Sequence, residues 1–308
     1  MTSSARRRIA AAVVGTLFVV AAVTGAVYAL LRDLSTVRSS LRSISVPYAL
    51  AAAALAVASV AMLAERWRAT LTALGANASR AEVRRWFMAG QIGKYVPGGV
   101  WHVVGQGELA RRSGIDRRVA YSSVLLSTAA LLGGATVIVI GGRAIGADVS
   151  VPWWVIAVGL LAGAVALVPP VRSRLVARLD DGSAGTRLTA ARLAALTVGS
   201  VPVWLVIGVS TWCVAEALGA PVDARTVVVG AVASWLVGIA TIPAPGGIGA
   251  REAVLVALLD GTLGTATATL VALVSRLVFV AADVACFVVA RRGVSVAARR
   301  AASSTASG

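Results

Sequence analysis

Long runs without any charged side chain restrict this chain to a fold that lies in a membrane. The run from Ile9 to Leu31 contains no charge, and about 20 apolar residues suffice to cross a bilayer as a helix. Hydrophobic residues make up 58% of the chain and charged residues 14%, whereas a soluble domain carries about 25% charge. The sequence therefore predicts an integral membrane protein.

The apolar runs have the length of helices and lack the alternation of strands, and a helix satisfies its own backbone groups in lipid. We expect an all-α polytopic membrane protein with about six full spans. A cleaved signal peptide is the competing interpretation of the first run, but its apolar core would be only about 7 to 15 residues long. The predicted spans are Ile9 to Leu31, Pro47 to Ala64, Val119 to Gly141, Val151 to Val171, Leu188 to Leu218 and Gly264 to Ala290.

Two further apolar segments are interrupted by Pro-Gly-Gly and do not fit as full spans. Trp86 to Ala110 is broken at Pro97, and Thr226 to Asp260 is broken from Pro243 to Gly247. Proline removes a helix donor and glycine permits tight turns. Each segment is therefore predicted to form a re-entrant hairpin of two half-helices that meet at a non-helical elbow.

The distribution of arginine predicts the topology, because short cytoplasmic loops are enriched in Lys and Arg. With cytoplasmic N- and C-termini, the basic stretches 6–8, 66–85, 111–118, 172–192 and 291–300 all fall inside. The two hairpins then enter from opposite sides, as in an inverted repeat. We expect one transmembrane domain over residues 1–298, with halves 1–142 and 151–292, and a disordered cytoplasmic tail over residues 299–308.

The elbows are the predicted binding site for an anion. A half-helix that begins after Pro-Gly-Gly presents free N–H groups and the positive end of its dipole. Cationic side chains at membrane depth require an offsetting partner, and a phosphate group would provide one. The candidate substrate-binding residues are Lys94, Tyr95, Pro97, Gly98, Gly99, Trp101, His102, Gln106, Pro245, Gly246, Gly247, Arg251, Glu252 and Arg276.

A purely structural role is the alternative for the charged candidates. In that interpretation Arg251 pairs with Glu252 or a facing helix, Arg276 pairs with Asp283, and Lys94 reaches towards the interface. For His102 the purely structural interpretation is favoured over metal or proton chemistry, because no Cys, Asp or Glu lies at metal-ligand spacing, and a hydrogen-bonding role is the alternative. The sequence therefore predicts no metal and no cofactor.

The net charge of +16 does not indicate nucleic-acid binding, because these arginines lie between apolar segments rather than on one soluble patch. Cys213 and Cys286 fall inside predicted spans and are expected to be buried thiols. Phosphate-loop, nucleophile-elbow and zinc-protease motifs are missing from the sequence, and no soluble stretch is long enough for a catalytic domain. We therefore expect a protein that is not an enzyme.

The stretch from Gly93 to Trp101 and the stretch from Pro243 to Glu252 resemble the transmembrane region of lysylphosphatidylglycerol synthases and the stand-alone flippase-like proteins of that superfamily. Ser275-Arg276 is similar to a late Tyr-Arg pattern of the family, with serine in place of tyrosine. The resemblance covers nearly the whole chain and implies a lipid-translocating module whose re-entrant helices enclose a phosphate-bearing headgroup. Aminoacyl transfer is not expected, because the chain ends soon after its last predicted span.

Together these features predict a flippase of the bacterial plasma membrane that moves a phosphate-bearing envelope lipid, a polyprenyl-phosphate-linked sugar or an anionic phospholipid. Two alternatives remain open at this point. One is a secondary transporter of a small anion, and the other is a non-transporting membrane partner of an envelope glycosyltransferase. The expected partners are thus a membrane lipid and an envelope glycosyltransferase; the sequence leaves the oligomeric state open.

Overall fold

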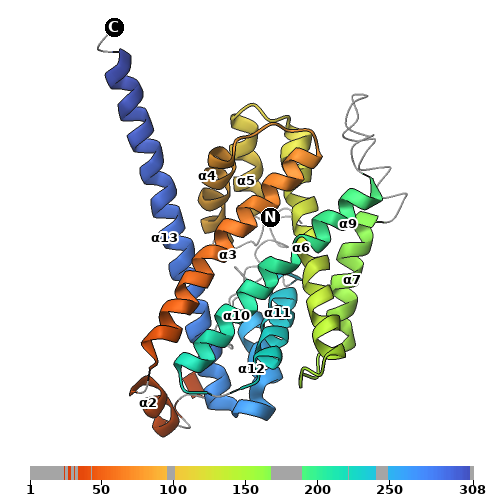
Figure 1. Cartoon of the computed structure of the whole chain (residues 1–308), viewed down its shortest axis with the longest axis vertical. Coiled ribbons are helices and arrows are strands. Elements are labelled where there is room, and N and C mark those ends of the chain that lie inside the picture. Colours follow the sequence, from red (N-terminus) through yellow and green to blue (C-terminus); the bar gives the residue numbers. More distant parts are fainter. Residues whose placement is uncertain are drawn as a thin grey trace, which may run out of the picture.

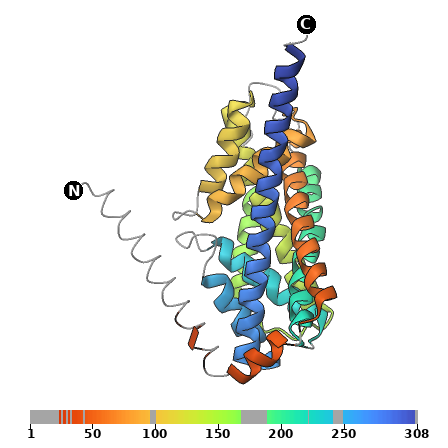
Figure 2. The ribbon, with the colours of Figure 1, turned by 90° about the vertical axis from the view of Figure 1, so that its left-hand side faces the viewer.

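The protein is a bundle of α-helices, seen from two sides in Figures 1 and 2. The computed structural model describes residues 24, 27, 28, 31, 34–42, 44–95, 101–167, 189–220, 222–240 and 249–305. Within these ranges, four helical segments are long and apolar enough to cross a membrane: Val46–Ala73, Arg117–Ala144, Ala190–Ala217 and Thr265–Arg291. They confirm four of the predicted spans. The first predicted span lies almost entirely outside the described residues.

Helix α3 (Val46–Ala73) packs against α10 (Val201–Ala217) and α13 (Thr265–Thr305). Pro47 lies at its first turn, where the missing N–H costs no helical hydrogen bond. The short helix α2 (Leu34–Arg42) precedes it at the lower end of the bundle in Figure 1. Trp67 of α3 is almost fully buried. The centroid of its ring lies 6.3 Å from the ring centroid of Trp86 and 6.3 Å from that of Phe87.

Helix α4 (Arg80–Gln91), the 3-10 turn η1 (Ile92–Tyr95) and helix α5 (Trp101–Arg112) form a compact pair beside α3. Ser79 and Glu82 make a reciprocal capping box that starts α4, which satisfies two backbone donors. The two helices approach closely, since a Cβ added to Gly90 would lie 2.5 Å from Cγ of Gln106. Residues 96–100, which include Pro97, Gly98 and Gly99, lie outside the described residues.

A group of ion pairs ties α4 to the end of α3. Glu65 accepts from Arg68 at 3.0 Å, from Arg80 at 3.1 Å and from Arg84 at 2.9 Å. The basic and apolar pattern of residues 79–87 predicts an amphipathic helix on the inner surface. A helix does begin in this stretch, as α4, and its Val83, Trp86 and Phe87 are buried against the bundle.

The side of the bundle away from α4 and α5 contains α6 (Arg117–Ala144), α7 (Trp153–Leu167) and α9 (Ala190–Val198), and α10 runs between them and α3 (Figure 1). The span predicted from Leu188 to Leu218 is divided between α9 and α10 at Gly199 and Ser200. The Ser200 hydroxyl donates to the Ala130 carbonyl at 3.2 Å or to the Leu196 carbonyl at 2.9 Å. Only part of the span predicted from Val151 to Val171 is described, as α7.

Helices α11 (Ala224–Ala240) and α12 (Ala250–Leu263) lie side by side and form the second compact pair. Gly249 precedes α12 with a φ of 86°, a left-handed conformation that glycine adopts without strain. Residues 241–248, which include Pro245, Gly246 and Gly247, lie outside the described residues.

Helix α13 runs along the whole molecule and extends beyond the other helices at its C-terminal end (Figures 1 and 2). It contacts α3, α4, α10, α12 and η1. The helix continues to Thr305, so residues 299–305 are helical where composition predicted a disordered tail. The alanines of this segment have a high helix propensity, which offsets the lower helix propensity of its serines and threonine.

Candidate functional site: a cluster of charged residues on α13

The single lysine of the chain forms a buried ion pair with α13. Nζ of Lys94 lies 2.6 Å from Oδ2 of Asp283, and the Tyr95 hydroxyl donates to the same oxygen at 2.6 Å. The side chain of Asp283 is only 2% exposed. Lys94 and Tyr95 come from η1, so this pair fixes the end of the α4–η1 segment to the middle of α13.

A second ion pair joins α12 to α13. Arg276 donates to Oε1 of Glu252, and both side chains are largely shielded, at 15% and 13% exposure. The other oxygen of Glu252 accepts the backbone N–H of Gly249 at 2.7 Å. Both oxygens of this carboxylate are therefore occupied.

This arrangement differs from the structural alternative in one pairing and corrects one expectation about the site. Arg276 pairs with Glu252 rather than with Asp283, because seven residues of helix separate Arg276 from Asp283 by about 10 Å along the axis. The start of α12 was expected to present free N–H groups, yet Glu252 turns back and accepts the N–H of Gly249, the residue that precedes the helix, at 2.7 Å. A carboxylate at this position offsets the positive end of the helix dipole. The start of α12 therefore attracts an anion less strongly than we expected.

Arg251 is the third cation of the cluster and is held by aromatic rings. Its guanidinium carbon lies 3.9 Å from the ring centroid of Trp235 on α11 and 5.2 Å from that of Phe279 on α13. Arg251 is only 5% exposed. Among the described residues it forms no salt bridge with a carboxylate, and its electrostatic interactions extend to Glu252, Arg276, Tyr95 and Asp283.

The cluster therefore joins elements from both compact helix pairs on one face of α13. We call the residues Lys94, Tyr95, Arg251, Glu252, Arg276 and Asp283 the charge cluster. Three of them are cations and two are carboxylates, which leaves one net positive charge in a shielded environment. An unbalanced buried charge is unfavourable unless a counter-ion approaches it, so the site is suited to an anion.

The remaining candidates are distributed around the cluster. Trp101, at the start of α5, is 50% exposed, whereas Gln106 is 4% exposed and lies at the close contact between α4 and α5. His102 is partly buried next to Gly93, whose added Cβ would lie 2.9 Å from the His102 backbone nitrogen. The Pro-Gly-Gly candidates, Pro97, Gly98, Gly99, Pro245, Gly246 and Gly247, lie outside the described residues.

The sequence analysis did not single out Trp235 or Phe279, and its structural alternative paired Asp283 with Arg276, whereas the structure pairs Asp283 with Lys94. A detectable signal was the spacing of Arg276, Phe279 and Asp283, because residues three, four and seven apart lie on one helix face. No comparable signal marked Trp235, which lies in an apolar helix with several other large side chains.

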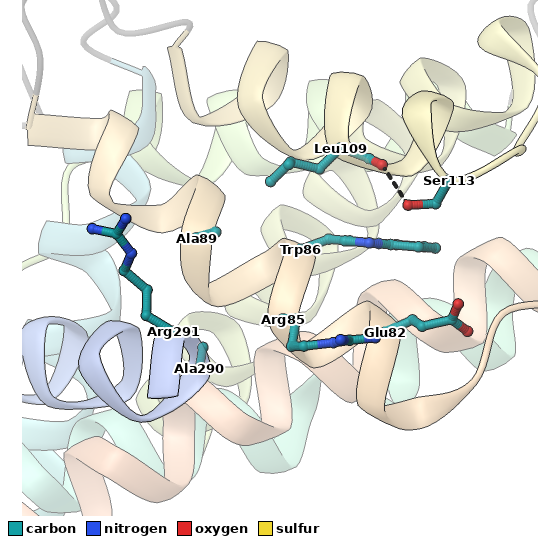
Figure 3. A pocket seen from close by; sticks show the side chains of 8 residues that line it. All are labelled: Glu82, Arg85, Trp86, Ala89, Leu109, Ser113, Ala290 and Arg291. Carbon is teal, nitrogen blue, oxygen red and sulfur yellow. Dashed lines mark hydrogen bonds between the residues drawn. The ribbon is translucent and has the colours of Figure 1, made fainter. Parts of the chain in front are cut away.

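A hollow of about 270 Å³ lies between α4, α5 and α13, away from the charge cluster (Figure 3). Leu109 of α5 and Ser113, just after the end of α5, face Trp86 and Arg85 of α4 across it. Ala290 and Arg291 contribute from α13, about two helical turns beyond Asp283. None of the predicted site residues lines this hollow. In the described part of the chain, no group of three or more His, Cys, Asp or Glu residues is placed to hold a metal ion.

These features define a class of protein, a multi-pass α-helical membrane protein with a shielded, net-positive cluster between its helices. Residues 9–285 match the family described as the lysylphosphatidylglycerol synthase TM region, and the chain belongs to this family. The family is linked to lipid modification and translocation. No curated protein matches the chain at a significant level.

Proposed function

We propose that this protein is a lipid translocase whose charge cluster holds the phosphate of a membrane lipid while the lipid tails remain in the bilayer. The supporting observation is the excess of one positive charge among Lys94, Arg251, Arg276, Glu252 and Asp283, next to a helix long enough to span the membrane. A phosphate diester carries one negative charge and would balance the cluster. Arginine and lysine are well suited to this contact.

The two compact helix pairs fit the predicted hairpins. Helices α4 and α5 pack together, and so do α11 and α12, with a Pro-Gly-Gly sequence in each connection. We propose that both pairs are re-entrant, that they form an inverted repeat of residues 1–142 and 151–292, and that access alternates as one half rocks against the other. Because Glu252 caps α12, side-chain cations rather than the N-terminus of this helix would make the main contact with phosphate.

The proposed substrate is a phosphate-bearing envelope lipid, a polyprenyl-phosphate-linked sugar or an anionic phospholipid, in a bacterial plasma membrane. Both termini would be cytoplasmic. The action would be transport without covalent chemistry or a cofactor, and an envelope glycosyltransferase would be the partner that supplies or consumes the lipid.

The decisive experiment is a headgroup-accessibility assay in proteoliposomes with fluorophore-labelled phosphatidylglycerol and, separately, a labelled polyprenyl phosphate sugar. A membrane-impermeant reductant destroys only the fluorophores that reach the outer leaflet. The natural protein should expose the inner-leaflet label. The Arg251→Ala variant should slow this exposure by at least about tenfold, since a charge-assisted contact contributes about 1.5 to 3 kcal/mol.

The matched control is Arg225→Ala, because Arg225 is an exposed arginine that pairs with Asp223 far from the cluster. This variant should translocate lipid at the natural rate. Equal rates for Arg251→Ala and the natural protein would contradict the proposal. Uptake of a small soluble anion without lipid movement would favour a solute carrier, and neither activity would favour a non-transporting partner.

A further inference from the structure

The hollow between α4, α5 and α13 is lined by two arginines that have no described ion pair. Arg85 lines it from α4 and Arg291 from α13 (Figure 3). The neighbouring arginines of α4, Arg80 and Arg84, both pair with Glu65. Within the described part of the chain, no carboxylate pairs with Arg85 or Arg291 in this way. Both charges are therefore available to a ligand.

Arg85 also has a shielded donor that lacks an acceptor. Its side chain is partly buried, and its Nε is shielded from solvent without a hydrogen-bond partner among the described residues. A buried donor without an acceptor is unfavourable, and such a group in a folded protein indicates a missing partner. A phosphate that accepts hydrogen bonds from the guanidinium would provide one.

The charges that line the hollow favour an anion. Glu82 is the carboxylate in the lining, and it already accepts the Ser79 N–H at 3.0 Å and the Ser79 hydroxyl at 2.6 Å. The guanidinium carbon of Arg291 lies 5.5 Å from the ring centroid of Phe287, a contact that does not neutralise its charge. Two cations and one carboxylate leave one net positive charge, which a phosphate diester would balance.

The hollow lies at the depth where lipid headgroups are expected. Arg291 is the last residue of the membrane-span candidate on α13, and Ser113 precedes the candidate that begins at Arg117. Trp86 and Leu109 provide apolar walls, and tryptophan is enriched at the membrane interface. The volume of about 270 Å³ is just below the range of about 300 to 1,000 Å³ for small-molecule sites. It therefore suits a headgroup rather than an entire lipid.

We propose that this hollow binds the headgroup of an anionic phospholipid from the leaflet at this end of the bundle, at a site separate from the charge cluster. Arg85 contacts the phosphate, Arg291 adds its charge from α13, and Trp86 and Leu109 contact the glycerol and the start of the tails. The bound lipid joins α4 and α5 to α13 and so stabilises the folded protein. This inference does not rest on the proposed function, because none of the charge-cluster residues lines the hollow.

The test is thermal unfolding of the full-length Arg251→Ala variant in detergent with increasing dihexanoyl phosphatidylglycerol, so that binding at the charge cluster is already weakened. A ligand that binds the folded state raises the unfolding temperature, and the concentration dependence gives Kd. Adding Arg85→Gln should raise Kd about tenfold, because a charge-assisted contact is lost. Arg291 is exposed, so Arg291→Gln should raise Kd only about threefold.

The matched control is Arg84→Gln, because Arg84 is the adjacent residue of α4 but pairs with Glu65 at 2.9 Å. This change should leave Kd unchanged, and equal Kd values for Arg84→Gln and Arg85→Gln would overturn the inference. If Arg85→Gln does not fold, Ala290→Leu fills part of the hollow and leaves both arginines in place. It should also raise Kd, and an unchanged value would count equally against the site.

Two further probes identify the ligand class. Dihexanoyl phosphatidylcholine should stabilise the protein much less, because its choline cation cancels the charge of its phosphate. Inorganic phosphate should also stabilise it less, because it makes no apolar contacts. Equal stabilisation by either probe would overturn an anionic-lipid site. A normal translocation rate for Arg251→Ala, in contrast, would contradict the proposed function and leave this inference intact.

Discussion

At the scale of single residues, the three cations of the charge cluster differ in the kind of group that they contact. Lys94 and Arg276 have carboxylates, whereas Arg251 lies over the rings of Trp235 and Phe279. An aromatic face holds a guanidinium in position without neutralising its charge. Arg251 is thus kept in place and keeps its full charge for a ligand.

Replacement of the Trp235 ring should therefore weaken anion binding. We expect Trp235→Leu to lower the affinity for dihexanoyl phosphatidylglycerol by about tenfold, equivalent to about 1.4 kcal/mol, which lies within the range of shielded cation–π contacts. Trp235→Phe keeps a ring face and should stay within about threefold of the natural affinity. Nε1 of Trp235 has no hydrogen-bond partner in the described part of the chain, so this change sacrifices no described hydrogen bond. Equal losses in the two variants, measured by calorimetry, would contradict a role for the ring face.

The residue types of the site were predictable from sequence, but their pairing was not. Lys94, Arg251 and Arg276 are rare charges in apolar segments, and such charges indicate a functional site by their position in the sequence alone. The partner of each depends on which helices face one another, and helical periodicity carries no information on that. The cap by Glu252 was readable in principle, because a glutamate three residues after the start of a helix is a known signature.

At the scale of elements, glycine permits the close contact between α4 and α5. The added Cβ at Gly90 would approach Cγ and the backbone nitrogen of Gln106 at 2.5 and 3.0 Å. Small residues allow helix backbones to approach closely in membrane proteins. This contact positions η1, and with it Lys94, against α13.

Gly90→Ala should consequently destabilise the protein by about 1 to 3 kcal/mol, the usual cost of overpacking. The matched control is Gly141→Ala, because no atom lies within 4 Å of the added Cβ at this helical position. That change should be neutral or should stabilise α6 by up to about 1 kcal/mol through helix propensity. Thermal unfolding in detergent checks both, and shifts of the same sign would be inconsistent with tight packing at Gly90.

Hydropathy located the long elements well and the interruptions less well. The predicted span from Val119 to Gly141 lies inside α6, because a long apolar run has few alternatives in lipid. The break between α9 and α10 has apolar sequence on both sides, so no change in hydropathy marks it. It coincides instead with Gly199 and with Pro202, which lies in the first turn of α10 and cannot donate to a preceding helical turn. The Ser200 hydroxyl at the break donates to the Ala130 carbonyl.

At the scale of the whole molecule, the two ends of the bundle differ in charge. The end with the α3–α4 and α5–α6 connections carries many arginines, among them Arg84, Arg112 and Arg118. The opposite end has few, including Arg143 and Arg225. These two arginines lie at the same end, as the hydrogen bond from Arg225 to the Ile145 carbonyl at 3.0 Å shows. This asymmetry favours a cytoplasmic position for the first end.

Labelling of single cysteines in intact cells tests this orientation. In a background with Cys213 and Cys286 replaced by alanine, we expect Asp148→Cys to react with a membrane-impermeant maleimide, because the α6–α7 connection would face outward. Ser113→Cys, at an exposed position in the α5–α6 connection, should react only after the cells are opened. The reverse pattern would place the arginine-rich end outside and contradict the predicted topology.

Helix α13 carries Arg276, Phe279 and Asp283 and then continues without interruption beyond the rest of the bundle. One part of this helix is held by the ion pairs of the charge cluster, and its C-terminal part projects from the bundle. A small tilt of the helix at Asp283 would produce a larger displacement at the far tip, because the displacement grows with distance from the pivot along a continuous helix. A reporter group attached near Thr305 would therefore register events at the charge cluster from outside the membrane.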